Sequence, residues 1–444
     1  MWQRLNLSFG WLAVMIGLLP FLVQCAPAGS SAAKTQADND AAADRPATVV
    51  EEIAPPGAEA PPGYDSKTWA DVVTEARGQS VNWYMWGGQD NINNWINGFV
   101  ADTLKAQYDI TLNQVPLVDT VEAVNQVLGE VEAGVETDGV VDMIWINGEN
   151  FHTLRQAELL YGPFAQFLPN SIYVNWDDPS VSTDLGFPVD FYESPWGKAR
   201  MVIAYDSAKL PEPPTTIDGL IAWIKANPGQ FTYPAPPDFT GTAFITHLCY
   251  QAAGGREPFS LEFNEQLFEE TFPACWDLLN DIEPYLWREG QTYPESHARQ
   301  QDLFANSEVF FDMAFNPAEA SSMVAAGRFP ETTRTFVFDS GTLANTHYVA
   351  IPANSAHKAA AMVLANFLLS LEAQYSKADV ANWGDFPAIE VSRLSQDWQD
   401  KFNALPRGVA TLPNDILDKN RLPELPATWR LPMEKGWEEN VLKR

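Results

Sequence analysis

Residues 140–146 read VVDMIWI, a run in which every side chain except that of Asp142 is apolar. A strand of this kind is expected where both faces of a sheet are covered, as in parallel α/β proteins. Residues 80–86 and 110–117 also have strand composition, and the segment after each of them, 90–107 and 119–133, has apolar residues at helical spacing. This alternation of strands and helices predicts right-handed crossovers and a parallel sheet.

A second α/β pattern begins at residue 201. Its predicted strands are 201–205, 230–234, 309–315, 334–338 and 348–352, and its predicted helices are 217–226, 242–253, 261–280 with a break at Pro273, 317–326 and 356–369. The proline-rich segment 210–214 is stiff and extended, as a crossing between lobes would be. We therefore predict an α/β protein with two lobes, a hinge and an interlobe cleft. Lobe 1 comprises residues 66–200, lobe 2 comprises 201–341, and residues 342–444 return to lobe 1 and form a helical tail; the crossings lie near 205–214 and 341–346.

The N-terminus has the features of an export signal. Residues 9–25 contain no charged side chain and follow a single basic residue, Arg4. This apolar run is short for a membrane span and has the length of a secretory signal segment. Residues 26–65 are rich in Ala, Pro, Gly and acids and lack apolar periodicity, which predicts a disordered tether. We therefore expect a signal peptide over residues 1–25 and an exported chain.

Two processing schemes are open at this signal. Residues 22–25, LVQC, resemble the bacterial lipobox, in which a lipid is attached to the cysteine, although Gln24 stands where that pattern has Gly, Ala or Ser. The alternative is ordinary cleavage after Ala28, because residues 26–28 fit the small-x-small rule. A long tether suits a lipoprotein, so we favour lipidation of Cys25 and a periplasmic or cell-envelope location. A retained N-terminal membrane helix is the third alternative.

Charge and cysteine content limit the partners. The formal net charge is −31, and it becomes −32 when residues 1–24, whose only charge is Arg4, are removed. Such a chain is repelled by nucleic acids and anionic membranes, so we expect no nucleic-acid partner and no membrane contact beyond a lipid anchor. Cys249 and Cys275 stand 26 positions apart in an exported chain, and they form either a disulfide or two buried thiols.

The sequence offers little support for an enzyme. None of its five histidines lies in a HExxH motif, and no P-loop, GxSxG or GxGxxG pattern is present. The chain has 58 acidic residues, so pairs of carboxylates are expected by chance and do not indicate a glycosidase. We therefore expect a binding protein with no catalytic residue, no cofactor and no metal, and retain a membrane-tethered enzyme as a less favoured alternative.

Polar and aromatic turns, most of them punctuated by glycine, follow the predicted strands. Ligands of open α/β sheets gather beyond the carboxyl ends of the strands, where glycine lets backbone approach a ligand and tryptophan offers a flat apolar face. The alternative is that these residues are ordinary helix caps and core tryptophans. The predicted ligand-binding residues are Trp86, Gly87, Gly88, Asn147, Glu149, Asn150, Ser194, Trp196, Asp238, Thr240, Gly241, Thr242, Trp287 and Asn316.

These motifs, taken together, resemble those of bacterial ABC-transporter solute-binding proteins with the type II periplasmic-binding fold. The segment 349–361 with 365–374 is similar to that wide class, and more narrowly the chain resembles the YnjB-type group. The runs that carry the narrower resemblance are 86–88, 145–151, 193–197, 232–244, 284–290, 315–318 and 382–385, which lie within residues 78–386.

The resemblance implies a two-lobed receptor, expected to be a monomer, that closes on a small solute and delivers it to an inner-membrane ABC permease. Related receptors bind thiamine, polyamines, ferric iron or sugars, and the adjacent tyrosines of the iron-binding relatives are absent here. Tryptophan together with Glu149 and Asp238 favours a small organic cation such as thiamine or a polyamine. A sugar, which also stacks on tryptophan, is the alternative ligand.

Overall fold

The computed structural model describes residues 55–260, 263–419 and 421–443. The predicted signal peptide, the predicted lipidation site at Cys25 and most of the predicted tether lie outside these residues. Within the described part of the chain, no helix is long and apolar enough to cross a bilayer.

The first sheet contains the strands of the predicted β-α-β-α-β unit. Its order is β11(Arg421–Pro423), β10(Thr342–Ala350), β3(Met143–Ile146), β1(Ser80–Trp86) and β2(Thr111–Leu117), and β6(Glu193–Arg200) also pairs with β10. The pairs β1–β2 and β1–β3 are parallel, as the sequence predicted, whereas β10 runs antiparallel to β3 and β6. The sheet is therefore mixed.

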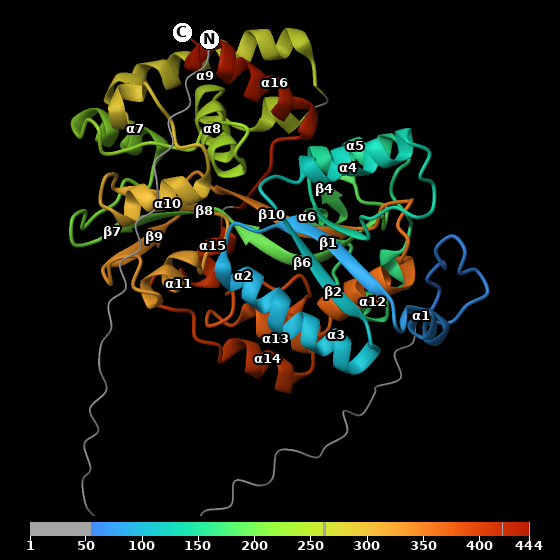
Figure 1. Cartoon of the computed structure of the whole chain (residues 1–444). Helices are drawn as coiled ribbons and strands as arrows, with labels where there is room; N and C mark the ends of the chain where they lie inside the picture. Colours follow the sequence, from blue (N-terminus) through green and yellow to red (C-terminus); the bar gives the residue numbers. More distant parts are fainter. Residues whose placement is uncertain (1–54, 261–262, 420, 444) are drawn as a thin grey trace, which may run out of the picture. The chain divides into compact units, whose positions relative to one another are not determined.

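Helices cover both faces of this sheet, which explains the nearly continuous apolar composition of β3 (Figure 1). One face packs on α1(Trp69–Ala76), on α12(Lys358–Leu368), and on a continuous helical run made of α2(Asp90–Trp95), η1(Ile96–Val100) and α3(Ala101–Tyr108). Helix α13(Leu371–Ala378) follows α12 along the chain. The other face packs on α4(Val121–Glu132) and α5(Glu149–Gln156). Side chains of β1 alternate between the two cores: Trp83 is fully buried with the first group, and Tyr84 packs with the second.

The second sheet is smaller and antiparallel. Its order is β8(Phe311–Ala314), β7(Val202–Asp206) and β9(Thr333–Phe336). A separate hydrophobic core joins this sheet to α7(Ile217–Ala226), α8(Phe239–Ala252) and α9(Glu265–Ile282), while α10(His297–Ala305) and α11(Glu319–Ala325) contribute to a further cluster.

Short elements complete the described chain. They are η2(Ala165–Phe167), η3(Pro169–Tyr173), α6(Pro179–Ser182), the hairpin β4(Thr183–Asp184) and β5(Phe187–Pro188), η4(Glu257–Ser260), η5(Glu283–Tyr285), η6(Trp287–Gly290), η7(Val391–Arg393), α14(Gln396–Asn403), α15(Asn414–Lys419), α16(Ala427–Trp437) and η8(Glu438–Leu442).

The chain passes between the sheets at Met201, earlier than the predicted segment 205–214. Strand β6 ends at Arg200 and β7 begins at Val202, while the Met201 amide donates to the Leu343 carbonyl, 2.8 Å away. The return lies between the end of β9 at Phe336 and the start of β10 at Thr342. Two short connections therefore lie side by side, and the proline-rich segment belongs to the loop that leads into α7.

Two local predictions were wrong. Residues 230–234 form no strand: the Phe231 carbonyl accepts from the Trp287 amide at 2.7 Å, and Pro234 has no N–H for a strand ladder. Pro273 does not break the helix, because α9 continues through it from Glu265 to Ile282. Burial of Phe272, Cys275 and Leu279 holds this helix against its neighbours and outweighs the local cost of the proline.

The C-terminal helix also differs from the prediction. Trp429, Met433 and Trp437 of α16 are fully buried in the core of the second sheet, although the tail was expected to return to lobe 1. Strand β11, just before this helix, does pair with β10 of the first sheet. The tail therefore crosses from one sheet to the other core, and this places the side chains of α16 beside both.

Candidate ligand site

The strand ends that were predicted to form the site do open helices in the structure. Strand β1 leads through Gly87 and Gly88 into α2, and β3 leads through Asn147 and Gly148 into α5. On the second sheet, β8 leads through Phe315 and Asn316 to α11; the turn at Asp238 opens α8 but follows no strand within the described residues. Helix starts therefore carry many of the candidate residues, and some of their first-turn N–H groups are already bonded to Asp238 and Asn316.

The glycines in these turns fit close internal packing. A Cβ on Gly87 would lie 2.5 Å from the Cβ of Pro116, and one on Gly88 would lie 2.2 Å from the Trp86 ring. At Gly241 a Cβ would lie 1.9 Å from the Pro234 carbonyl oxygen. A neighbouring residue therefore leaves no room for a side chain at each of these positions. Contact with a ligand is not needed to explain why glycine stands there.

Three predicted ligand contacts are buried in the first sheet's cores. Trp196 and Ser194 have no exposed surface, and Asn150 is 8% exposed. The Trp196 ring lies at 4.9 Å from Trp145 and 5.1 Å from Trp383, centroid to centroid, in edge-to-face geometry. This burial does not favour the predicted stacking of Trp196 on the solute, because other aromatic rings already pack around its ring.

Asp238 is a helix cap, which was the alternative interpretation. Its Oδ1 accepts hydrogen bonds from the amides of Thr240 and Gly241 at 2.9 and 3.0 Å, and its Oδ2 accepts from the His297 amide at 2.9 Å. Three backbone N–H groups therefore already occupy this carboxylate. Thr240 and Thr242 are buried as well, and the Thr242 hydroxyl donates to Glu434 Oε1 at 2.9 Å.

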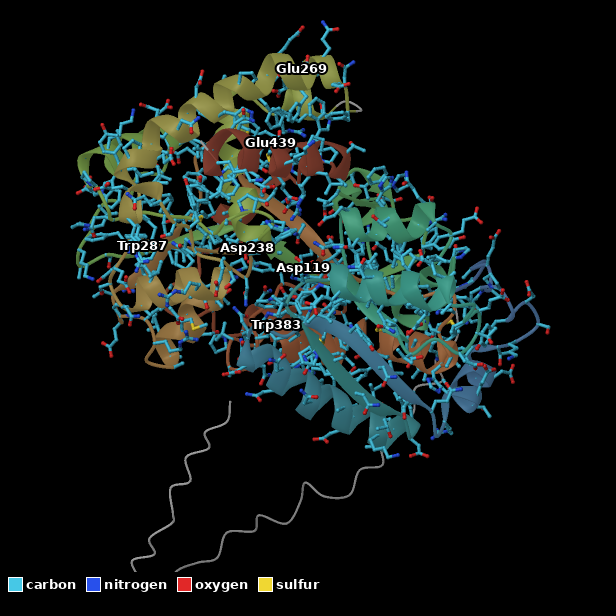
Figure 2. All side chains as sticks on the ribbon, turned by 45° about the horizontal axis from the view of Figure 1, so that its top comes forward. Asp119, Asp238, Glu269, Trp287, Trp383 and Glu439 are labelled. Carbon is cyan, nitrogen blue, oxygen red and sulfur yellow. A yellow bond between two sulfur atoms is a disulfide. The ribbon has the colours of Figure 1, made fainter. Side chains whose placement is uncertain are left out.

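Trp287 stands apart from the other predicted residues. In Figure 2 it lies well away from Trp383, whereas Asp238 and Asp119 lie nearer the middle of the molecule. Its ring packs beside the cluster of α10 and α11, and the Arg288 guanidinium lies 4.1 Å from its centroid. The structure therefore does not bring Trp287 together with the turns of the first sheet.

Direct contacts join the turns of the two sheets. The Asn316 side-chain amide donates to the Trp383 carbonyl at 3.2 Å. The side chain of Gln89, in the turn after β1, acts on the Glu319 carboxyl at the start of α11 and lowers its pKa. Gln89, Asn316 and Glu319 are all less than 9% exposed. Sequence reasoning identified Asn316 and the β1 turn but missed Gln89 and Glu319, for which the only signal was their place beside predicted turns.

A cluster of tryptophans lies beside these contacts on the first sheet. The buried Lys377 ammonium lies 5.0 Å from the ring centroid of Trp196 and 5.3 Å from that of Trp383, donates to the Trp196 carbonyl, and pairs with Asp385 at 2.8 Å. Burial would raise the pKa of Asp385, but Lys377 and His347 lower it below its usual range. The Lys377 ammonium therefore already occupies the space between the buried rings of Trp196 and Trp383. Two tryptophans that pack near them, Trp86 and Trp145, remain partly exposed.

A second group of charges lies at the strand ends of the second sheet. His297 Nε2 is 3.8 Å from Asp312 Oδ1 and 3.8 Å from Glu319 Oε1. Burial lowers the pKa of His297, but Glu319 and Asp312 together raise it to about 10, so the imidazole is protonated at neutral pH. Burial also raises the pKa of Glu319 to about 7, against the opposing effect of His297. Sequence reasoning missed all three residues.

Arg430 of α16 connects the two groups of elements. Its guanidinium is 3.7 Å from Glu149 Oε2 at the start of α5, 2.9 Å from Glu434 Oε1, and 4.8 Å from the ring centroid of Phe239. Glu149 was predicted to pair with a cationic ligand, and the structure gives it a cation from the chain itself. Arg430 was missed because it lies in the tail, far from every predicted turn.

Cys249 of α8 and Cys275 of α9 form a disulfide, with Cα atoms 4.7 Å apart. Of the two open alternatives, the structure therefore contains the bonded one. No group of three or more His, Cys, Asp or Glu side chains in the described residues has the geometry of a metal site.

The fold and this arrangement of turns define a two-lobed α/β binding protein of the type II periplasmic-binding class. A family model described as bacterial extracellular solute-binding protein matches residues 100–406. The chain is 38% identical over 369 residues to protein YnjB of Escherichia coli (strain K12), which covers 83% of this chain and 92% of YnjB.

Solved structures share the fold at low identity. The spermidine/putrescine ABC-transporter substrate-binding protein PotD of Streptococcus pneumoniae matches with a TM-score of 0.56 and 14% identity, over 82% of this chain and 98% of its own. The periplasmic binding protein AfuA of Actinobacillus pleuropneumoniae, solved with fructose-6-phosphate bound, matches with a TM-score of 0.57 and 13% identity, over 82% and 99%.

This chain belongs to the bacterial extracellular solute-binding proteins, and within them it is similar to YnjB. It is accordingly the solute-binding component of an ABC transporter, which binds a small solute outside the cytoplasm, in the periplasm or cell envelope, for a membrane permease. Its relatives and its fold are those of transport binding proteins rather than enzymes.

Proposed function

We propose that this receptor captures a small organic cation, such as thiamine or a polyamine, between the strand ends of its two sheets and delivers it to an inner-membrane ABC permease. The two lobes would be residues 66–200 with the return of the chain after 342, and residues 201–341 together with α16, whose buried side chains pack in the second core. They would move about the paired connections at Met201 and 337–341. Closure would bring the turn after β1 against the start of α11, as it stands in this structure.

The observation that supports a cation is the excess of carboxylates at the contacts between the sheets. The acids there include Glu149, Asp238, Asp312, Glu319 and Glu434, and the cations include His297 and Arg430; the nearby Lys377 is paired with Asp385. The predicted roles of Glu149 and Asp238 are weakened, because Arg430 and three backbone amides already occupy them. The partly exposed rings of Trp86 and Trp145, 6.5 Å apart between centroids, offer an adjacent flat surface.

A sugar is the second candidate, because Trp86 and Trp145 suit stacking on a sugar face as well as on a cation. AfuA was solved with a sugar phosphate bound, and PotD is named for polyamines, so this fold accommodates both classes. A sugar, however, would leave the excess of carboxylates without a partner. The net charge of −31 for the whole chain agrees with a cationic ligand.

Native mass spectrometry of freshly purified protein would test this proposal most directly, because it weighs whatever solute is carried along. Calorimetric titration with thiamine, putrescine and maltose would follow. We expect stoichiometric binding of a cation without chemical turnover. A retained neutral sugar or anion would overturn the cation assignment, and conversion of the solute to a product would overturn the receptor itself.

We further propose that the mature protein is a monomer anchored through a lipid on Cys25, with residues 26–65 as its tether. The support is the lipobox-like run at residues 22–25 and the composition of the tether. Detergent partitioning of wild type and Cys25→Ser in a bacterial host would test this. Wild type should follow the detergent phase, and Cys25→Ser should remain in the aqueous phase; equal partitioning would support cleavage after Ala28 instead.

A further inference from the structure

The His297, Asp312 and Glu319 side chains converge from three different elements of the second lobe. Asp312 lies on β8, Glu319 opens α11 and His297 opens α10. The exposed fraction of the side chain is 2% for Asp312, 5% for Glu319 and 12% for His297. Two carboxylates within 3.8 Å of one imidazole ring, this deeply buried, are costly to keep in a protein unless their charge finds a partner.

The charges of this cluster do not balance. One protonated imidazole faces two carboxylates, and the neighbouring Asp238 contributes a further negative charge, while the exposed Arg328 acts on Glu319 from a distance. Gln301 donates a hydrogen bond to Glu319, and the nearby Gln89 side chain lowers the pKa of Glu319, but neither brings a charge. One negative charge therefore remains uncompensated when both Asp312 and Glu319 are ionised.

The cluster also has unused hydrogen-bonding capacity. Within the described residues, Asp312 Oδ1 and His297 Nε2 have no hydrogen-bond partner although both atoms are buried. Asp142, which directly precedes β3 of the first sheet, is different: it accepts from the Asn82 amide at 2.9 Å and from the Ser355 hydroxyl at 2.9 Å. An aspartate with both oxygens bonded in this way is structural, whereas Asp312 Oδ1 has no hydrogen-bond donor among the described residues.

The cover of the cluster comes from the other lobe. Gln89, in the turn after β1, lies close enough to Glu319 to lower its pKa, and Asn316, three residues before Glu319, donates to the Trp383 carbonyl. If the lobes separate, these two contacts break together and Glu319 becomes accessible from the interlobe side. The partly exposed Trp86 lies three residues before Gln89 on the same turn.

We infer that Asp312 and Glu319 form the anionic anchor that holds the ammonium or other cationic centre of the solute, and that Gln89 occupies Glu319 in its place when the site is empty. This inference rests on the proposed function and names the residues that carry it out. It replaces Asp238 and Glu149, the acids expected from sequence, with two acids that share a single close cation, His297. The solute's N–H or cationic group would take the free oxygen of Asp312 and displace the Gln89 amide.

The test uses Asp312→Asn and Glu319→Gln, which keep side-chain size and remove the charge. Exposed Glu308→Gln, on the loop before β8, is the matched control with the same chemistry outside the cluster. Calorimetric titration with thiamine and putrescine should show affinity reduced at least about tenfold in each cluster variant, as expected for loss of a charged hydrogen bond, and unchanged affinity in the control. Circular dichroism and a melting curve for each variant establish that it is folded.

Two comparisons separate the possible failures. If wild type binds thiamine or putrescine and both cluster variants bind as tightly, while Glu149→Gln loses affinity, the anchor assignment is overturned and the cation receptor stands. If wild type binds only maltose or none of the three solutes, the cation receptor and the anchor fall together. A variant that fails to fold is replaced by Gln89→Ala, which should bind more tightly than wild type because it removes the competing amide; weaker or equal binding contradicts the inference.

Discussion

Asn316 reaches from the end of β8 to donate its side-chain amide to the backbone carbonyl of Trp383, 3.2 Å away, while its Oδ1 accepts from the Ala318 amide at 3.0 Å. One side chain thus starts α11 and joins it to the aromatic cluster of the first sheet. Because both bonds are buried, the residue links the local geometry of the turn to the contact between lobes.

The first prediction concerns the contact of Asn316 with Trp383. Asn316→Asp keeps the acceptor for Ala318 and replaces the donor to Trp383 with an oxygen, so two acceptors would face each other. We expect solute affinity to fall several-fold and the melting temperature to fall at least as far as in Asn316→Ala, because a buried carboxylate without a cation is costly. Asn316→Ala should lower both, since a buried unsatisfied group costs about 1–3 kcal/mol. Unchanged solute affinity in both variants would argue against a role in closure.

The second prediction concerns Arg430. Its guanidinium is 5% exposed and lies between Glu149 and Glu434, so removal leaves buried carboxylate without its cation. Arg430→Met should lower the free energy of unfolding by roughly 3 kcal/mol, as breaking one partner of a buried pair does. Urea denaturation at neutral pH would measure this. Glu149→Gln, whose side chain is 26% exposed, should cost clearly less; a larger cost there would contradict our description of Arg430 as the centre of the group.

The third prediction follows from the burial of Trp196. Its substitution by alanine should act on stability and not directly on solute contact. We expect a loss of about 3–5 kcal/mol, because a fully buried tryptophan leaves a large cavity and uncovers Trp145 and Trp383. Trp86→Ala is the comparison, since the Trp86 ring is partly exposed: it should lower solute affinity with a smaller effect on the melting temperature. The reverse pattern would restore the binding role expected from sequence.

The fourth prediction is a pH dependence set by His297. Its pKa is raised from 6.5 to about 10 in the folded chain, so the stability that its charge provides is complete below pH 6.5 and is lost as the pH rises through about 10. The difference in unfolding free energy between wild type and His297→Gln should therefore shrink between pH 7 and pH 10. A difference that is constant over this range would show that His297 is neutral in the folded protein.

The fifth prediction is that cation binding weakens in acid. Burial raises the pKa of Glu319 to about 7, so this carboxyl takes up a proton as the pH falls below 7 and loses its attraction for a cation. Wild-type affinity for a solute of constant charge, such as thiamine, should decrease from pH 8 to pH 5.5. Glu319→Gln should show a flatter profile, and an identical profile in the two proteins would contradict the role of Glu319.

Loss of the disulfide offers a simpler check of the fold. Cys249 and Cys275 close a segment of 26 positions between α8 and α9, and removing such a cross-link typically costs about 2–4 kcal/mol. The double variant Cys249→Ser, Cys275→Ser should unfold at lower urea concentration than wild type. Added reductant should shift wild type toward the variant and leave the variant unchanged.

The sequence by itself determined the two α/β patterns, because apolar periodicity reports which faces of a helix or strand are buried. The strand VVDMIWI at residues 140–146 predicted a covered sheet, and β1, β2 and β3 are indeed parallel neighbours with helices on both faces. Glycine and polar residues in the sequence also located the turns. Asp238 caps α8, as expected under the alternative interpretation that the turn residues are ordinary helix caps.

Only the tertiary structure decided which side chains of those turns are available. Asn316 and Trp383, which are joined by a hydrogen bond, are 67 positions apart. Lys377 and Arg430 come from segments with no pattern in common, yet they lie against Trp196 and Glu149, which sequence assigned to a solute. Periodicity carries no information on such contacts, because they depend on how separate elements pack. For the same reason, the free acceptor of Asp312 looked no different in sequence from the fully bonded Asp142.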